Sequence, residues 1–176
     1  MALTPKKLLF LGDSLIEYFD WGRRFPDCLV YNLGISGETA GGLHARLGRI
    51  FERIESPDHV FIMTGINNLA MGDADFLDDY RDILMEISAA YPFAAIYVHS
   101  LLPVSFPYIS NEDIRDMNLK LGEMASIQGV SFIDLHSRFL DEKGGPREEY
   151  LLEDGVHVSD EGYRVWSSQI EALLIG

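Results

Sequence analysis

The sequence predicts an α/β fold, a three-layer α/β/α sandwich with a five-stranded parallel sheet in flavodoxin-like strand order. Three observations lead to this prediction. Short apolar runs rich in β-branched and aromatic residues recur along the chain, as strands require. Segments with apolar side chains at helical spacing lie between these runs. The early runs are apolar almost throughout, which is typical of strands that helices cover on both faces. We expect a single domain, residues 1–176.

The expected elements alternate along the chain. The apolar runs predict strands at 8–11, 28–33, 59–63, 95–99 and 130–135. Apolar residues three or four positions apart predict helices over 43–54, 76–91, 114–124 and 163–173. Helix start signals agree, because Asp75, Ser110 and Ser159 offer side-chain oxygens to the free amides of a first turn.

Charge and composition argue against several classes of function. The chain has 28 acidic and 14 basic side chains and a formal net charge of −14. This charge repels phosphates, so we expect neither nucleic acid nor an anionic lipid surface as a partner. No apolar run approaches the roughly 20 residues of a membrane-spanning helix, so we expect no stable membrane insertion and a cytoplasmic location. The single cysteine, Cys28, fits a reducing compartment.

Metal and phosphate-loop chemistry have little support in the sequence. The acid-rich segment 73–79 lacks the ligand spacing and the glycine of a calcium loop. Segment 34–39 lacks the Gly-Lys-Ser/Thr ending of a phosphate loop. The sequence also has no cluster of His and Cys with the spacing of metal ligands. We therefore expect no metal and no cofactor.

The chemically unusual residues follow the expected strands. In open parallel sheets the ligand crevice lies beyond the carboxyl ends of the strands. A serine placed where a strand ends and a helix begins has its hydroxyl at this crevice and its amide among the unpaired donors of the helix start. Four segments stand at such ends: Gly12-Asp13-Ser14, Gly34, Gly65-Ile66-Asn67-Asn68, and His99 with Ser100.

Four motifs in a fixed order carry a resemblance to a known family. They are Gly12-Asp13-Ser14-Leu15, Gly34 within 32–37, Gly65-Ile66-Asn67-Asn68, and Asp154-Gly155-Val156-His157. Together they resemble the SGNH hydrolases, also called GDSL esterases and lipases, over the whole chain. The chain is similar to the platelet-activating factor acetylhydrolase-like and lysophospholipase-like members.

The resemblance implies a serine ester hydrolase that needs no cofactor. It implies Ser14 as the nucleophile, and His157 and Asp154 as its partners in a catalytic triad. It further implies an oxyanion hole formed by the amide of Ser14, by Gly34 and by Asn67. Where the family often has aspartate the chain has Asn68, as the acetylhydrolases acting on platelet-activating factor do, and we interpret Asn68 as an ordinary turn residue.

Elementary chemistry agrees with the implied triad. A serine hydroxyl is a poor nucleophile at neutral pH and needs a nearby base, for which an imidazole is suited. Asp154 and His157 stand three residues apart and can point to the same side of one loop. The carboxylate then holds the Nδ1 proton and leaves Nε2 facing Ser14. The competing interpretation of Ser14 alone is a helix cap.

Several alternatives stay open at this stage. The resemblance implies small acyl esters, lysophospholipids or thioesters as substrates. A carbohydrate O-acetylesterase is an alternative, and so is a non-catalytic binding module that keeps the fold. Leu69, Leu102 and Pro103 either form an apolar wall for the acyl group or pack loops. His99 either lines a pocket at the crevice or is a structural histidine whose hydrogen bonds are satisfied. Exposed Phe and Tyr side chains on loops mark either a homodimer face or a lid.

Overall fold

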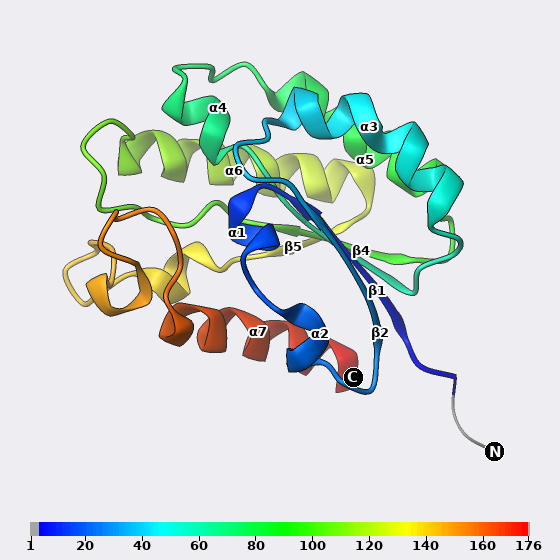
Figure 1. Ribbon diagram of the computed structural model, residues 1–176. Helices are drawn as coiled ribbons and strands as arrows, with labels where there is room; N and C mark the ends of the chain where they lie inside the picture. Colours follow the sequence, from blue (N-terminus) through cyan, green and yellow to red (C-terminus); the bar gives the residue numbers. More distant parts are fainter. Residues whose placement is uncertain (1–3, 176) are drawn as a thin grey trace.

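A computed structural model describes residues 4–175 and contains a single parallel sheet of five strands (Figure 1). The strand order is β2-β1-β3-β4-β5, which is the predicted flavodoxin-like order. The strands are β1 (Lys7–Gly12), β2 (Leu29–Gly34), β3 (His59–Met63), β4 (Ala95–His99) and β5 (Ser131–Ile133).

Helices cover both faces of the sheet and complete the three predicted layers (Figure 1). One face carries α3 (Ala40–Arg53), α5 (Leu77–Ala90) and α6 (Asn111–Gln128). The other face carries α7 (Asp160–Ile175) and the short α2 (Trp21–Arg24). Single turns complete the fold, namely α1 (Ser14–Glu17), α4 (Ile66–Ala70), and the 3-10 turns η1 (His136–Phe139) and η2 (Glu148–Tyr150).

Two of the three predicted helix start signals act as expected. Ser110 Oγ accepts hydrogen bonds from the amides of Glu112 and Asp113 at the start of α6. Ser159 Oγ accepts one from the amide of Gly162 at the start of α7. The prediction for Asp75 is wrong, because α5 begins one residue later than expected for that cap and has no side-chain cap at all. The Asp75 amide instead donates to Asp73 Oδ1.

The core lies on both sides of the central strands. Residues 8–11 of β1 and 60–63 of β3 are fully buried, as continuous apolar runs predict. Toward α7 the core is aromatic: the Phe10 and Trp21 rings stack with their centroids 4.3 Å apart. Trp21 also meets Trp166 of α7 edge to face. This packing holds α7 against the strand that leads into the Gly12-Asp13-Ser14 segment.

The two edge strands differ from the prediction. Strand β2 is half exposed, with 44% of Leu29 accessible, because it has a neighbour on one side only. Strand β5 is shorter than the apolar run 130–135, and only 131–133 pair with β4. Beyond it, the amides of Leu135 and His136 donate to Ser100 Oγ instead of continuing the ladder.

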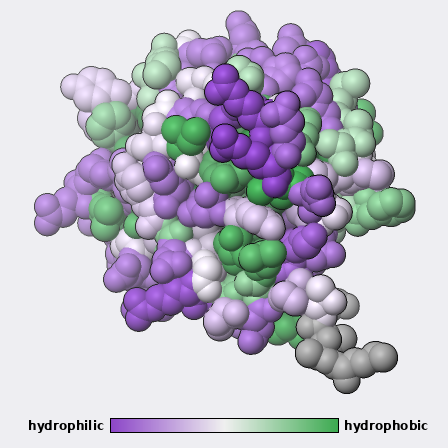
Figure 2. Space-filling model, turned by 45° about the vertical axis from the view of Figure 1, so that its right-hand side comes forward, coloured by the Kyte–Doolittle hydropathy of each residue, from purple (hydrophilic) through white to green (hydrophobic). Residues whose placement is uncertain are grey.

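One face of the molecule is mostly polar. Figure 2 shows charged and polar side chains over most of one face, with apolar side chains scattered between them. Over residues 4–175, none of the helices combines the length and apolar character needed to cross a membrane.

Candidate active site

The backbone at the end of β1 brings Ser14 to the sheet edge. Gly12 ends β1 with a φ of 153°, and a Cβ at this position would collide with the carbonyl oxygen of Met63 in β3. Only glycine therefore allows this close approach of the two strand ends. Asp13 then caps α1 by accepting a hydrogen bond from the Leu15 amide. Ser14 becomes the first residue of α1 and is 6% exposed.

The structure brings together the three side chains that the family resemblance implies as a triad. His157 Nε2 lies 3.0 Å from Ser14 Oγ, and His157 Nδ1 lies 2.6 Å from Asp154 Oδ2. Both contacts are within hydrogen-bond distance. The three groups thus form a continuous relay from carboxylate to imidazole to hydroxyl, across 143 residues of sequence.

The loop that carries Asp154 and His157 is held by its own hydrogen bonds. Asp154 Oδ1 accepts from the amides of Val156 and His157, both at 2.9 Å. Burial alone raises the pKa of the Asp154 carboxyl, but these two bonds and the bond from the His157 ring outweigh it and hold that pKa below its usual value. The Asp154 carboxylate is therefore charged at neutral pH and can fix the orientation of the imidazole.

Contacts outside the loop fix its place relative to Ser14. Gly155 has a φ of 71° and packs against the backbone of Ser105, whose amide donates to the Gly155 carbonyl at 2.8 Å. The Tyr163 hydroxyl of α7 donates to the Leu15 carbonyl of α1 at 2.8 Å. This buried bond ties the helix after the histidine loop to the turn that carries the serine.

The three expected oxyanion donors come from the ends of neighbouring strands. Gly12 of β1 is the register partner of Gly34 in β2 and of Met63 in β3. The Ser14 amide opens α1 and so has no acceptor within the helix. Asn67 Nδ2 donates to the Glu38 carbonyl at 2.9 Å, which leaves its second N–H for a ligand.

The Gly34 amide has a different environment from the one expected. It donates to Asn32 Oδ1 at 3.1 Å, so an oxyanion at this edge would share that N–H with the asparagine. Asn32 Nδ2 in turn contacts the carbonyl oxygens at the end of α1, those of Ile16, Glu17 and Phe19. Asn32 therefore joins α1, the turn that carries Ser14, to β2 through hydrogen bonds. No role was predicted for Asn32 from the sequence, although a polar residue inside an apolar strand is a signal.

The interpretation of Asn68 as an ordinary turn residue is wrong. Its side chain is buried, its Oδ1 accepts from the Ala40 amide at 2.9 Å, and its Nδ2 donates to Asp73 Oδ2 at 2.7 Å. Asn68 thus joins α4 to the start of α3. Together with the Asn67 bond to Glu38, it holds the loop between β2 and α3 against the end of β3.

Asp13, the residue before Ser14, has a buried carboxyl group with a raised pKa. Its carboxyl is fully buried, and burial raises its pKa to about 7. Oδ1 accepts from the Leu15 amide, while Oδ2 has no hydrogen-bond partner within the described chain.

His99 does not line the crevice. It is fully buried between the rings of Phe61 and Trp166, and burial lowers its pKa to about 3. It is therefore a neutral histidine packed in the core, but neither ring nitrogen has a hydrogen-bond partner among residues 4–175, so the expectation that its hydrogen bonds are satisfied is wrong.

The three predicted substrate contacts occupy different surroundings. Leu102 and Pro103 are buried, and Leu102 belongs to the main core. Leu69 is half-buried in α4 and lines a cavity of about 220 Å³ with Met117 and Lys120 of α6. Their contact with substrate stays a prediction. Within 4–175, no three His, Cys, Asp or Glu side chains are arranged to hold a metal ion.

Comparison with known proteins decides the family. The model of the GDSL-like lipase/acylhydrolase family matches residues 10–165. The chain belongs to this family. The resemblance seen in the four motifs is thereby confirmed, and the protein is an acylhydrolase of the carboxylic ester hydrolase class.

Solved structures of GDSL proteins share the fold. A Streptococcus pneumonia protein named after platelet activating factor is 26% identical, with a TM-score of 0.87 over 99% of this chain and 86% of its own. A GDSL-like lipase from Bacteroides thetaiotaomicron is 23% identical, with a TM-score of 0.78 over 96% of this chain and 87% of its own. An acetyl xylan esterase is 19% identical, with a TM-score of 0.75 over 95% and 98% of the two chains. No curated protein matches this acylhydrolase in sequence.

Proposed function

We propose that this GDSL acylhydrolase is a serine esterase that forms an acyl-enzyme on Ser14. The observation that carries the proposal is the relay from Asp154 through His157 to Ser14, with contacts of 2.6 and 3.0 Å. Such an arrangement activates a hydroxyl for attack on an acyl carbon.

The first half of the reaction transfers the acyl group. Ser14 Oγ attacks the carbonyl carbon of the ester while its proton passes to His157 Nε2. The oxyanion that forms accepts hydrogen bonds from the Ser14 amide and the Asn67 side chain, and shares the Gly34 amide with Asn32. His157 then gives its proton to the leaving-group oxygen as the carbon–oxygen bond to that group breaks, and the alcohol departs.

The second half releases the acid. A water molecule gives one proton to His157 Nε2 and attacks the acyl carbon. The Ser14 ester bond breaks, and the proton on His157 returns to Ser14 Oγ. Asp154 stays ionised throughout and stabilises the imidazolium that forms twice in the cycle.

The proposed substrates are small acyl esters, lysophospholipids or thioesters. The net charge of −14 supports neutral or zwitterionic substrates over those with several phosphates, because like charges repel during approach. The structural neighbour named acetyl xylan esterase makes acetylated sugars the second candidate class, and at 19% identity it supports this through the fold alone. The cytoplasmic location and the homodimer stay predictions.

Labelling with an organofluorophosphonate tests the proposal directly. We expect mass spectrometry to map the label to Ser14 in the wild-type protein. Ser14→Ala should take up no label and lose turnover of p-nitrophenyl acetate by at least about 10⁴-fold. Ser126→Ala, a change at an exposed serine of α6, is the matched control and should behave as wild type. Turnover retained in Ser14→Ala, or a label elsewhere, would refute the proposal.

Substrate choice needs a separate measurement. Turnover of p-nitrophenyl acetate, longer p-nitrophenyl esters, a lysophospholipid, an acyl thioester and an acetylated sugar should be compared at one pH. The proposal expects an ester or thioester to exceed the acetylated sugar in kcat/KM. A labelled protein that turns over only the acetylated sugar would identify a carbohydrate O-acetylesterase. A protein that binds these compounds without turnover or label would be a binding module.

A further inference from the structure

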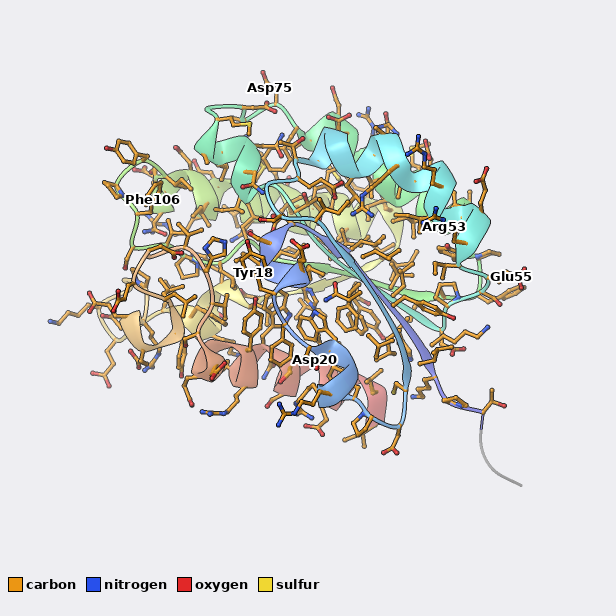
Figure 3. All side chains as sticks on the ribbon, in the orientation of Figure 1. Tyr18, Asp20, Arg53, Glu55, Asp75 and Phe106 are labelled. Carbon is orange, nitrogen blue, oxygen red and sulfur yellow. The ribbon has the colours of Figure 1, made fainter. Side chains whose placement is uncertain are left out.

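Tyr18 covers one face of the His157 ring. Tyr18 directly follows α1 as its C-cap residue, four positions after Ser14. Its ring stacks on the imidazole with the two centroids 5.2 Å apart and the planes inclined by 28°. Figure 3 labels Tyr18 beside α1. With 58% of the residue exposed, this aromatic ring contributes little to the hydrophobic core.

The Tyr18 ring is itself tethered. Its hydroxyl lies 2.9 Å from Ser36 Oγ, within hydrogen-bond distance. The Ser36 amide donates to Glu17 Oε2 at 2.7 Å. Ser36 belongs to the loop between β2 and α3, which also carries Glu38, the partner of Asn67. Tyr18 thus connects the histidine loop to the loop that holds the Asn67 side chain.

We propose that Tyr18 is a positioning residue for His157, an inference that rests on the proposed esterase function. Three contacts surround the imidazole: Asp154 at Nδ1, Ser14 at Nε2, and Tyr18 on the ring face. The two hydrogen bonds act on the ring nitrogens and touch neither face of the ring, so a small rotation of the imidazole is still possible. A flat ring stacked on the face restrains that rotation and keeps Nε2 aimed at the serine oxygen.

Stacking also favours the charged form of the imidazole. The face of an aromatic ring carries negative potential and attracts a cation placed over it. His157 becomes an imidazolium each time it takes a proton from Ser14 or from water, so the stack is stronger in that state than in the resting one. Asp154, from its own loop, and Asp13, from the end of β1, also interact with the His157 ring. Both are unchanged when Tyr18 is replaced.

The test compares Tyr18→Leu with Tyr18→Phe. Leucine removes the aromatic face, whereas phenylalanine keeps it and loses only the bond to Ser36. Phe93→Leu is the matched control, because Phe93 is an exposed aromatic residue far from the site. It lies at the amino ends of the strands, in the turn before β4. Each protein is assayed for kcat and KM with p-nitrophenyl acetate from pH 5 to 9, and for the rate of fluorophosphonate labelling.

The proposal expects a defect in kcat that phenylalanine rescues. Tyr18→Leu should lose roughly tenfold in kcat and in labelling rate while KM stays within about twofold. Tyr18→Phe should keep most of the kcat and of the labelling rate, and Phe93→Leu should match wild type throughout.

Other outcomes separate this inference from the proposed function. A wild-type protein that takes up no label overturns the esterase proposal, and the role of Tyr18 falls with it. A labelled wild type together with an unchanged kcat and labelling rate in Tyr18→Leu overturns the positioning role alone. So does a rise in KM at constant kcat, which would make Tyr18 a substrate contact. A Tyr18→Phe variant as impaired as Tyr18→Leu would likewise refute the role of the aromatic face.

Discussion

Replacing Asp13 by asparagine should change how the stability of the protein depends on pH. The Asp13 carboxyl is fully buried, with one oxygen bonded to the Leu15 amide and the other without a partner in the part of the chain described. Burial raises its pKa from 3.8 to about 7. Asparagine has nearly the same shape, keeps the acceptor for Leu15, and carries no charge at any pH. It therefore mimics the protonated acid.

The sign and size of the effect follow from proton linkage. Between pH 3.8 and 7 the unfolded chain has lost the Asp13 proton while the folded protein retains it. The stability that this proton contributes is fully present below pH 3.8 and is lost as the pH rises through 7. At 1.36 kcal/mol per pKa unit, the folded wild type should lose about 2 to 3 kcal/mol relative to Asp13→Asn between pH 5 and pH 8.

Urea unfolding followed by tryptophan fluorescence at pH 5, 6, 7 and 8 measures this difference. Asp116→Asn, at an exposed position of α6, is the control for the loss of one acidic side chain. We expect the free energy of unfolding of Asp13→Asn to rise relative to wild type with each step in pH, and to level off above 7. A difference that stays constant from pH 5 to 8 would show that the Asp13 carboxyl titrates as an exposed group does, and would refute the reasoning.

Two further substitutions test the packing that supports the site. Gly34→Ala would place a Cβ 2.8 Å from the Asp13 carbonyl oxygen in backbone that cannot yield, so we expect about 1 to 3 kcal/mol of destabilisation in thermal unfolding. A variant as stable as wild type would mean that β2 and α1 are not in this contact. Asn68→Ala should cost about 1 to 3 kcal/mol in urea unfolding, because it leaves the buried amide of Ala40 without an acceptor. Unchanged stability would show that Asn68 does not stabilise the protein by joining α4 to α3.

The prediction of the fold succeeded where local pattern and sheet architecture agree. Strands β3 and β4 have the predicted bounds, because each is a continuous apolar run with polar residues or turns at both ends. The apolar run 130–135 predicted a longer β5 than the structure has, since the number of paired residues depends on how far the neighbouring β4 extends. Asp75 failed as a helix cap because asparagine and aspartate side chains also stabilise turns, and here Asp73 captured its amide.

The residues of the candidate site also fall into those that a local pattern predicted and those that it did not. Ser14, Asp154 and His157 were identifiable because their motifs keep a fixed order and short internal spacing. No local pattern identified the roles of Asn32, Asn68 and Tyr18. The α1 carbonyls that Asn32 contacts, the Ala40 amide that Asn68 accepts from and the His157 ring under Tyr18 lie 13 to 16, 28 and 139 residues away in the chain, respectively.

Sequence alone determined the five strands and four long helices of this acylhydrolase, their order, and the side chains to which the family resemblance assigns the chemistry, because hydrophobic periodicity and motif spacing are local properties. It did not predict the short α1, α2 and α4. Tertiary structure determined how those side chains are held. Three contacts join segments that only the folded sheet brings together. They are the hydrogen bond from Tyr163 to Leu15, the hydrogen bonds from Asn32 to α1, and the stacking of Tyr18 on His157. Directional contacts of this kind depend on distances of a few tenths of an ångström, and these arise from packing of the whole chain.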